Sequence, residues 1–267
     1  METTRTKKKV IVNFANTQEL IEYIKQAPKA GNSRKERDQD FCSYEWDETL
    51  EALSSGWKES KQIKINADTL NVMGTGTGYT TEYDVVGDFL DIGTHLSGVP
   101  ECWGSMIEEP RAMKKAKILV DLFTSWRKSQ EEVGNRGSAI ISLIDRMREA
   151  GYFLEIELRC RMIGVVPNDT YFEYGLTVST DNGYSRDMLA FLVAHPGSFR
   201  RVGFAIMEVT QDHSNMRGYG KAPYSQDPLD SDIYFQPTSK DPDGTWYSIE
   251  SSKRKIDSML ENYERKA

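Results

Sequence analysis

The feature that most constrains the fold is a segment, residues 117–158, that reads as strand, helix, strand. The continuous apolar run KILVDLF at 117–123 is typical of a strand buried on both faces. Residues 137–151 place apolar side chains on one face of a helix, and Gly151 is a C-terminal stop signal. The run YFLEIELRCRMIGV then predicts a second strand. Two strands joined by one helix predict a parallel pair with a right-handed crossover.

The rest of the chain extends this pattern into a three-layer arrangement of strands and helices. We therefore predict an α/β fold, with a mainly parallel sheet and helices on both faces, plus an irregular α+β portion at 1–110. Residues 111–267 are expected to hold the sheet, and both portions to form one compact unit. The glycine-rich residues 73–103 are read as an extended loop or hairpin. Expected strands lie at 10–14, 62–67, 171–179, 199–209 and 232–236, and expected helices at 16–27, 47–57, 185–195 and 248–266.

Charge is distributed unevenly around a formal net charge of −7. Residues 1–37 hold nine Lys/Arg against four Asp/Glu, and residues 111–161 hold eleven against seven. Residues 38–110 hold three against fifteen, and residues 222–247 one against five. Local potential, rather than total charge, steers a polyanion. Basic regions on an acidic chain are compatible with single-strand binding and equally with a solvated surface.

Catalytic and metal-binding patterns are missing from the sequence. The three cysteines stand singly, which predicts reduced thiols, and the three histidines form no HExxH arrangement. No GxSxG motif is found either. We therefore expect a protein that is not an enzyme and needs no cofactor or metal.

No apolar run approaches the roughly 20 residues that cross a bilayer. The basic start METTRTKKKVIV lacks the apolar core of a signal peptide. We expect an intracellular protein without a membrane partner.

Aromatic and basic residues interleave in the predicted loops. Rings stack on the bases of single-stranded nucleic acid while Lys and Arg follow its phosphates. The alternative for each residue is an ordinary solvated cation or a ring that covers the core. The predicted nucleic-acid-binding residues are Trp126, Arg127, Lys128, Arg136, Arg200, Arg201, Arg217, Tyr219, Lys221, Tyr224, Arg34, Lys35 and Arg37.

The stretch Asp121-Leu122-Phe123-Thr124-Ser125 resembles the Asp-x-Ser-x-Ser motif of von Willebrand A-type domains. In that family the motif binds a divalent ion at the carboxyl end of a strand. Here Phe123 stands in place of the middle serine, and a phenyl ring cannot ligate magnesium. The resemblance implies a degenerate von Willebrand A/Rossmann-like half of roughly 150 residues whose ion site is lost.

Two longer stretches resemble uncharacterised proteins of tailed phages. They are DFCSYEWDETLEALSSGW and NRGSAIISLIDRMREAGYFLEIEL, within about residues 40–160. The chain also resembles, in size and class, the single-stranded-DNA-binding cofactor that schitovirid phages supply to their RNA polymerase. That resemblance implies binding to melted promoters, recruitment of the phage RNA polymerase, and a location in the cytoplasm of the infected bacterial host.

Three hypotheses follow. The first is a single-stranded-DNA-binding transcription cofactor, and the second is a non-enzymatic von Willebrand A-like protein-interaction module in phage assembly or host takeover. The third is a magnesium-dependent enzyme acting on nucleotides, with Asp121 and Ser125 near the ion. Oligonucleotide binding distinguishes the first from the second, and magnesium titration identifies the third.

Overall fold

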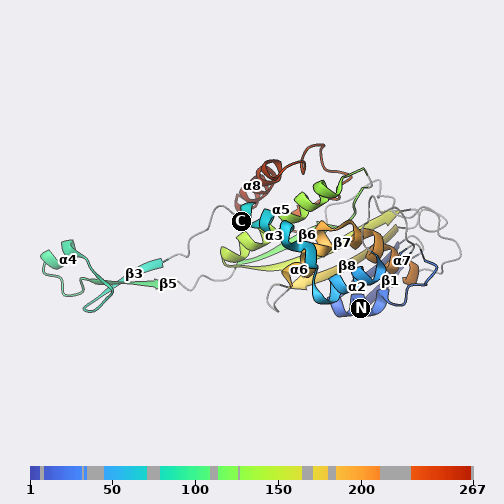
Figure 1. Cartoon of the computed structure of the whole chain (residues 1–267). Helices are drawn as coiled ribbons and strands as arrows, with labels where there is room; N and C mark the ends of the chain where they lie inside the picture. Colours follow the sequence, from blue (N-terminus) through green and yellow to red (C-terminus); the bar gives the residue numbers. More distant parts are fainter. Residues whose placement is uncertain are drawn as a thin grey trace.

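The computed structural model of the chain contains a six-stranded sheet, a three-stranded sheet and their helices (Figure 1). It describes residues 1–6, 9–31, 33–34, 45–70, 79–108, 114–125, 127–163, 171–179, 185–210 and 230–265.

The six-stranded sheet is mixed and mainly parallel. Its strands, in spatial order, are β1 (Glu2–Arg5), β2 (Lys9–Phe14), β8 (Tyr171–Ser179), β7 (Tyr152–Ile163), β6 (Lys114–Asp121) and β9 (Ile233–Phe235). Three pairs are parallel, namely β2 with β8, β6 with β7, and β6 with β9. The pairs β1–β2 and β7–β8 are antiparallel. The α/β prediction is confirmed at this level.

The strand–helix–strand unit forms as the sequence predicts. Strand β6 runs parallel to β7, and between them lies helix α5 (Gln130–Glu149). The helix begins with a capping box, in which the Ser129 hydroxyl accepts from the Glu132 N–H and Glu132 accepts from the Ser129 N–H. The chain leaves the helix through Gly151, whose φ of 82° is a backbone conformation that glycine adopts without steric strain.

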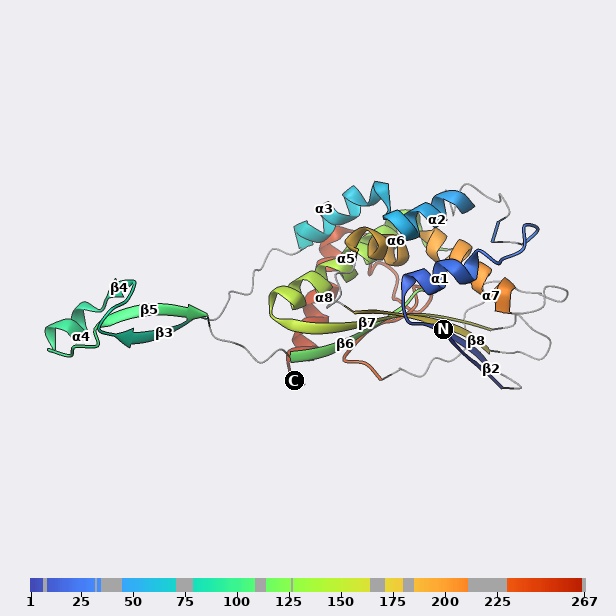
Figure 2. The ribbon, with the colours of Figure 1, turned by 90° about the horizontal axis from the view of Figure 1, so that it is seen from below.

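Apolar and charged residues alternate along the strands, so the apolar side chains lie on one face of the sheet, which the helices cover. In β7, the even positions from Leu154 to Met162 are buried and apolar, whereas the odd positions Glu157, Arg159 and Arg161 are charged. Figure 2 shows α1 (Thr17–Ile24), α2 (Trp46–Ser55), α3 (Lys61–Leu70), α5, α6 (Arg186–Ala194) and α7 (Phe204–Thr210) on one side of the strands. The C-terminal helix lies on the same side, because its Tyr263 ring lies 5.8 Å from that of Tyr152, an even position of β7. The expectation of helices on both faces is therefore wrong for the described part of the chain.

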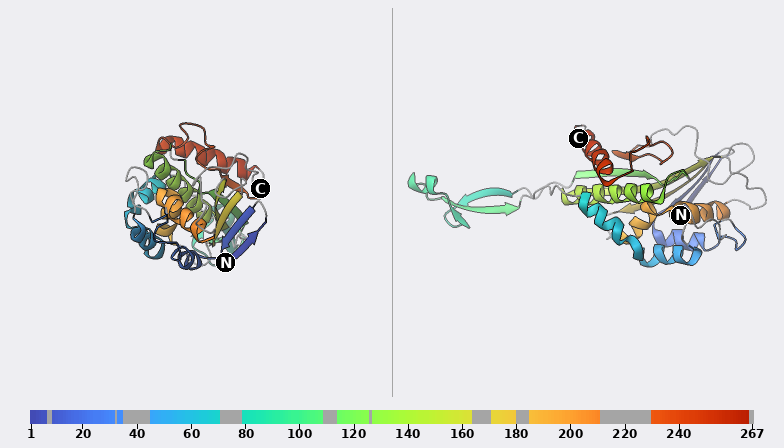
Figure 3. Two further views of the ribbon diagram at one scale, coloured as in Figure 1. Left: turned by 90° about the vertical axis from the view of Figure 1, so that its right-hand side faces the viewer. Right: turned by 45° about the horizontal axis from the view of Figure 1, so that its top comes forward.

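The helices of this layer come from both halves of the sequence. Figure 3 shows the layer end-on, beside the strands. The elements are α1, α2, η1 (Lys58–Ser60), α3, α6, the π-helical η2 (Ser198–Gly203), α7 and α8 (Ile249–Glu264).

Two predicted strands are helical instead. Residues 62–67 lie in α3, which buries Ile63 and Ala67, four residues apart, and leaves Ile65 46% exposed. A strand would have placed Ile63 and Ile65 on the same face, so the period was misread. Residues 199–209 form η2 and α7, which are buried almost all round. Such a run has no helical period to recognise.

The second sheet forms a projecting element, residues 79–108, which we call the arm. It consists of β3 (Tyr79–Asp84), β4 (Phe89–Leu90), α4 (Ile92–Leu96) and β5 (Trp103–Glu108), with strand order β3-β5-β4. Figures 1 and 2 show it standing away from the six-stranded sheet. None of its described residues belongs to the hydrophobic core. Residues 1–110 thus contribute β1 and β2 to the main sheet and also form the arm.

Candidate functional site

Asp121 lies at the carboxyl end of β6, where ligands commonly bind in α/β sheets. Its carboxylate is already engaged: Oδ1 accepts from the Phe123 N–H at 2.9 Å, and Oδ2 accepts from Arg161 Nε at 3.1 Å. The side chain is fully buried, and burial raises the pKa of Asp121 to about 6. Across the described residues, no group of three or more His, Cys, Asp or Glu is arranged to hold a metal ion. Asp121 therefore has a structural role at the strand end.

Arg136 is one of the predicted nucleic-acid contacts, and the structure contradicts that role. The side chain is 2% exposed on α5, and its guanidinium donates to the carbonyls of Asp121 and Gln236 at 2.9 and 3.0 Å. Burial lowers the pKa of Arg136, while Asp241 and Asp121 favour its charged form. A guanidinium sealed between two strand ends cannot follow a phosphate backbone. It joins the ends of β6 and β9 instead.

Arg201 is buried as well, at 4% exposure, and the prediction for it is wrong for the same reason. Its Nη1 donates to the Ser33 carbonyl at 3.0 Å. The neighbouring Arg34 is half-buried, lies 4.6 Å over the Trp46 ring and donates to the Lys25 carbonyl at 3.0 Å. Two predicted clusters that are distant in sequence, around residues 34 and 201, therefore meet in space. Their contact supports the fold and leaves little cationic surface.

The loop after β6 carries a cation beside an exposed ring. Arg127 is exposed, and Lys128 Nζ lies 6.0 Å from the centre of the Tyr247 ring. Tyr247 is 59% exposed. Lys128 also pairs with Glu132 at 3.2 Å and with Asp243 at 3.6 Å. Burial opposes the charge on Lys128, but the hydrogen bond to Glu132 and the negative charges of Glu132 and Asp243 together outweigh burial and raise the pKa of the amine.

Among the described residues, Arg200 is connected with this loop only through its neighbour in sequence. Its neighbour Phe199 packs against Phe123, with ring centres 5.0 Å apart, and Arg200 itself is half-exposed over Phe204. We call the surface of Arg127, Lys128 and Tyr247 the basic end, in which the Lys128 side chain is 11% exposed. Seven predicted contacts lie outside the described residues: Trp126, Lys35, Arg37, Arg217, Tyr219, Lys221 and Tyr224.

Tyr247 was not predicted from the sequence. It follows Trp246, whose indole N–H donates to Asp241 at 2.8 Å and whose ring is 2% exposed. In the adjacent pair WY, pattern alone cannot decide which ring points inward. In the structure the hydrogen bond to Asp241 holds Trp246 inward, and Tyr247 faces solvent.

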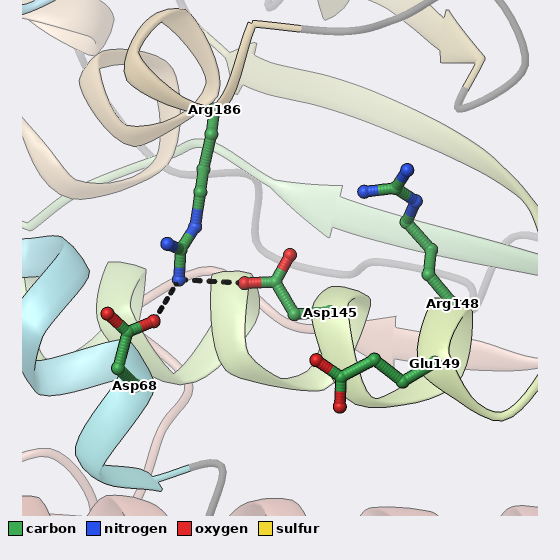
Figure 4. A pocket seen from close by; sticks show the side chains of 5 residues that line it. All are labelled: Asp68, Asp145, Arg148, Glu149 and Arg186. Carbon is green, nitrogen blue, oxygen red and sulfur yellow. Dashed lines mark hydrogen bonds and ion pairs between the residues drawn. The ribbon is translucent and has the colours of Figure 1, made fainter. Parts of the chain in front are cut away.

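A separate polar cavity of about 410 Å³ lies between α3, α5 and α6. Arg186 donates to Asp68 at 2.7 Å and to Asp145 at 2.8 Å, as Figure 4 shows. Arg148 and Glu149 complete its lining. These two ion pairs connect three helices, so the charged side chains of the cavity hold the helix junction together.

One comparison with known proteins bears on this chain. A family model described as a domain of unknown function (DUF7192) matches residues 2–264. The chain belongs to the DUF7192 family. No curated protein and no solved structure matches it. Among the described residues of this family member, no helix combines the length and apolar character needed to cross a membrane.

Proposed function

We propose that the chain is a non-enzymatic protein that binds single-stranded DNA through the basic end. The supporting observation is the exposed Tyr247 ring, which lies beside Lys128. Lys128 follows the exposed Arg127 in the loop after β6. The sequence suggested Trp126 as the ring beside these cations, and the ring that the described residues place beside Lys128 is Tyr247. A base stacked on an exposed ring contributes about 1–3 kcal/mol and demands little sequence preference.

The ion pairs of Lys128 determine how its amine could bind a DNA phosphate. Asp243, one of its partners, has a side chain that is 95% exposed and can swing into solvent. Glu132 is held by the capping box of α5 and stays in place. A phosphate would therefore replace Asp243 beside the amine. Because one carboxylate remains, each phosphate contact is weak, and several are needed for tight binding.

We further propose that the DNA-bound protein acts as a transcription cofactor that recruits a phage RNA polymerase to melted promoters. The two phage-like stretches of the sequence support this assignment. The net charge of −7 supports it too, because an acidic surface disfavours indiscriminate binding to duplex DNA. The site of action is then the cytoplasm of the infected host.

Fluorescence anisotropy with a labelled 20-nucleotide oligothymidine tests the DNA proposal. The wild type should bind the single strand more tightly than a duplex of equal length, with affinity falling as salt rises. Arg127→Ala with Lys128→Ala should weaken binding at least tenfold and reduce the salt dependence. Lys58→Ala with Lys61→Ala removes the same charge from exposed positions elsewhere and serves as the control.

The competing hypothesis is a protein-interaction module that ignores nucleic acid. It predicts no anisotropy change even at low salt. Equal weakening by the two double variants would also reject the basic end, since net charge alone would then explain binding.

A further inference from the structure

The arm concentrates the exposed apolar side chains of the molecule. Twelve large hydrophobic residues are exposed among those the structure describes, and nine of them lie within 79–108. The three others, Met1, Ile65 and Tyr247, are scattered over the main body. The nine are Tyr83, Val85, Val86, Phe89, Ile92, Leu96, Val99, Trp103 and Met106. Apolar surface gathered in one small element is typical of an interaction site.

One face of the arm sheet is organised around Gly104. Tyr83 and Phe89 both pair with Gly104, from opposite sides, and so point to the same face. The Phe89 ring lies directly over Gly104, where an added Cβ would meet it at 2.5 Å. Met106, two residues further along β5, extends this face and is 59% exposed. The result is an uncovered apolar strip.

Helix α4 adds a second apolar edge. Ile92 and Leu96 are four residues apart, so they lie on the same side of the helix, and they are 66% and 80% exposed. Asp91 caps this helix by accepting from the Thr94 N–H at 3.1 Å, which stabilises the first turn of the helix that carries the two side chains.

The charge of the arm has one sign. Residues 79–108 contain no Lys or Arg and six carboxylates: Glu82, Asp84, Asp88, Asp91, Glu101 and Glu108. A second arm would bring the same negative charge, so pairing of two arms is electrostatically disfavoured. The described main body offers only scattered exposed apolar residues as a receptor. Nucleic acid is excluded by the same repulsion. The complement must therefore be a different protein.

We propose that the arm is a docking element for another protein, whose receiving surface is an apolar groove bordered by lysine and arginine. Apolar side chains of the arm enter the groove, and the carboxylates meet its basic border. Desolvated apolar anchors supply most of the affinity in such contacts, and complementary charge supplies orientation and rate. This inference does not depend on DNA binding at the basic end.

Two measurements on the full chain test it. Sedimentation at tens of micromolar should show a monomer, whereas dimerisation lost on Ile92→Asp with Leu96→Asp would overturn the proposal in favour of a second copy. A photoreactive residue is then placed at Leu96, or at Ile65 as the control, in the cells that make this protein. An adduct with one protein should form from position 96 and not from position 65. No adduct, or an adduct with nucleic acid, overturns the proposal.

Reconstitution decides whether the captured protein is the partner. The purified captured protein should bind the wild-type chain with an affinity that falls at high salt. Ile92→Asp with Leu96→Asp and Glu82→Lys with Glu101→Lys should each weaken it at least tenfold, while Ile65→Asp leaves it within twofold. The two arm variants change different properties of exposed side chains, so a shared loss is not explained by one misfolded variant. Oligonucleotide binding should be unchanged in the two arm variants. Equal affinity of all variants for the captured protein would refute the docking role of the arm.

Discussion

Arg127 and Arg136 lie nine residues apart and have opposite environments. Arg127 is exposed, whereas Arg136 is buried and donates to two backbone carbonyls. Replacing Arg136 by Met should lower the free energy of unfolding by about 3 kcal/mol, because two strand-end carbonyls and Asp241 lose their partner. Arg127→Ala should stay within about 0.5 kcal/mol. Urea denaturation followed by circular dichroism measures both, and equal effects would contradict this assignment.

His195 provides a pH test at the same scale. It stacks on Phe191 and meets Trp57 edge-on, with Nδ1 accepting from the Gly197 N–H at 3.0 Å. Burial lowers the pKa of His195 to about 4, from 6.5. Between these values the unfolded chain takes up a proton that the folded chain excludes. Stability should therefore fall by about 3 kcal/mol as pH drops from 6.5 to 4.

His195→Asn, which cannot titrate, isolates this contribution. Asp121, with its pKa raised to about 6, contributes in the opposite direction, but equally in wild type and variant. The difference in slope of unfolding free energy against pH then belongs to His195. Parallel curves for the two proteins would show that His195 titrates normally.

At the scale of elements, local signals predicted what local chemistry controls. The continuous apolar β6 and the stop at Gly151 were both readable in the sequence. Residues 62–67 were misread because β-branched isoleucines favour strands, while tertiary packing of Ile63 and Ala67 selects a helix. Burial of Arg136 and Arg201 is likewise set by distant segments, so a sequence shows their charge but not their exposure.

The crossing of α5 and α6 yields a packing prediction. A Cβ at Gly137 would lie 2.2 Å from the Ala194 Cβ and 2.6 Å from its Cα, so the two backbones approach too closely for any side chain. Gly137→Ala should cost about 1–3 kcal/mol through overpacking. At Gly134, in the same helix, an added Cβ meets only the Ile63 Cδ1 at 3.2 Å. Gly134→Ala should be near neutral, because a gain of up to about 1 kcal/mol in helix propensity offsets the tight contact with Ile63. Thermal unfolding of the two variants compares them directly.

At the scale of the whole molecule, the two proposed binding surfaces are separated along β6. The arm precedes this strand in sequence, and the basic end follows it. A strand of eight residues spans roughly 26 Å, so the acidic apolar arm and the cationic loop lie at opposite ends. Such a separation allows two partners of opposite charge to bind at once without competing. The sequence contained the charge asymmetry, but only the fold shows that its two parts project from opposite ends.

This separation predicts that the main body does not need the arm to fold. The described arm residues share no strand pairing with the six-stranded sheet and do not enter its core. Replacing residues 79–108 by Gly-Ser-Gly should shift the melting temperature by less than about 3 °C, since the core loses under about 1 kcal/mol. Affinity for single-stranded DNA should stay within twofold of wild type. Gly137→Ala, measured alongside, confirms that the assay detects a damaged core. A broad, low transition in the armless chain would mean that the arm and the sheet fold as one cooperative unit.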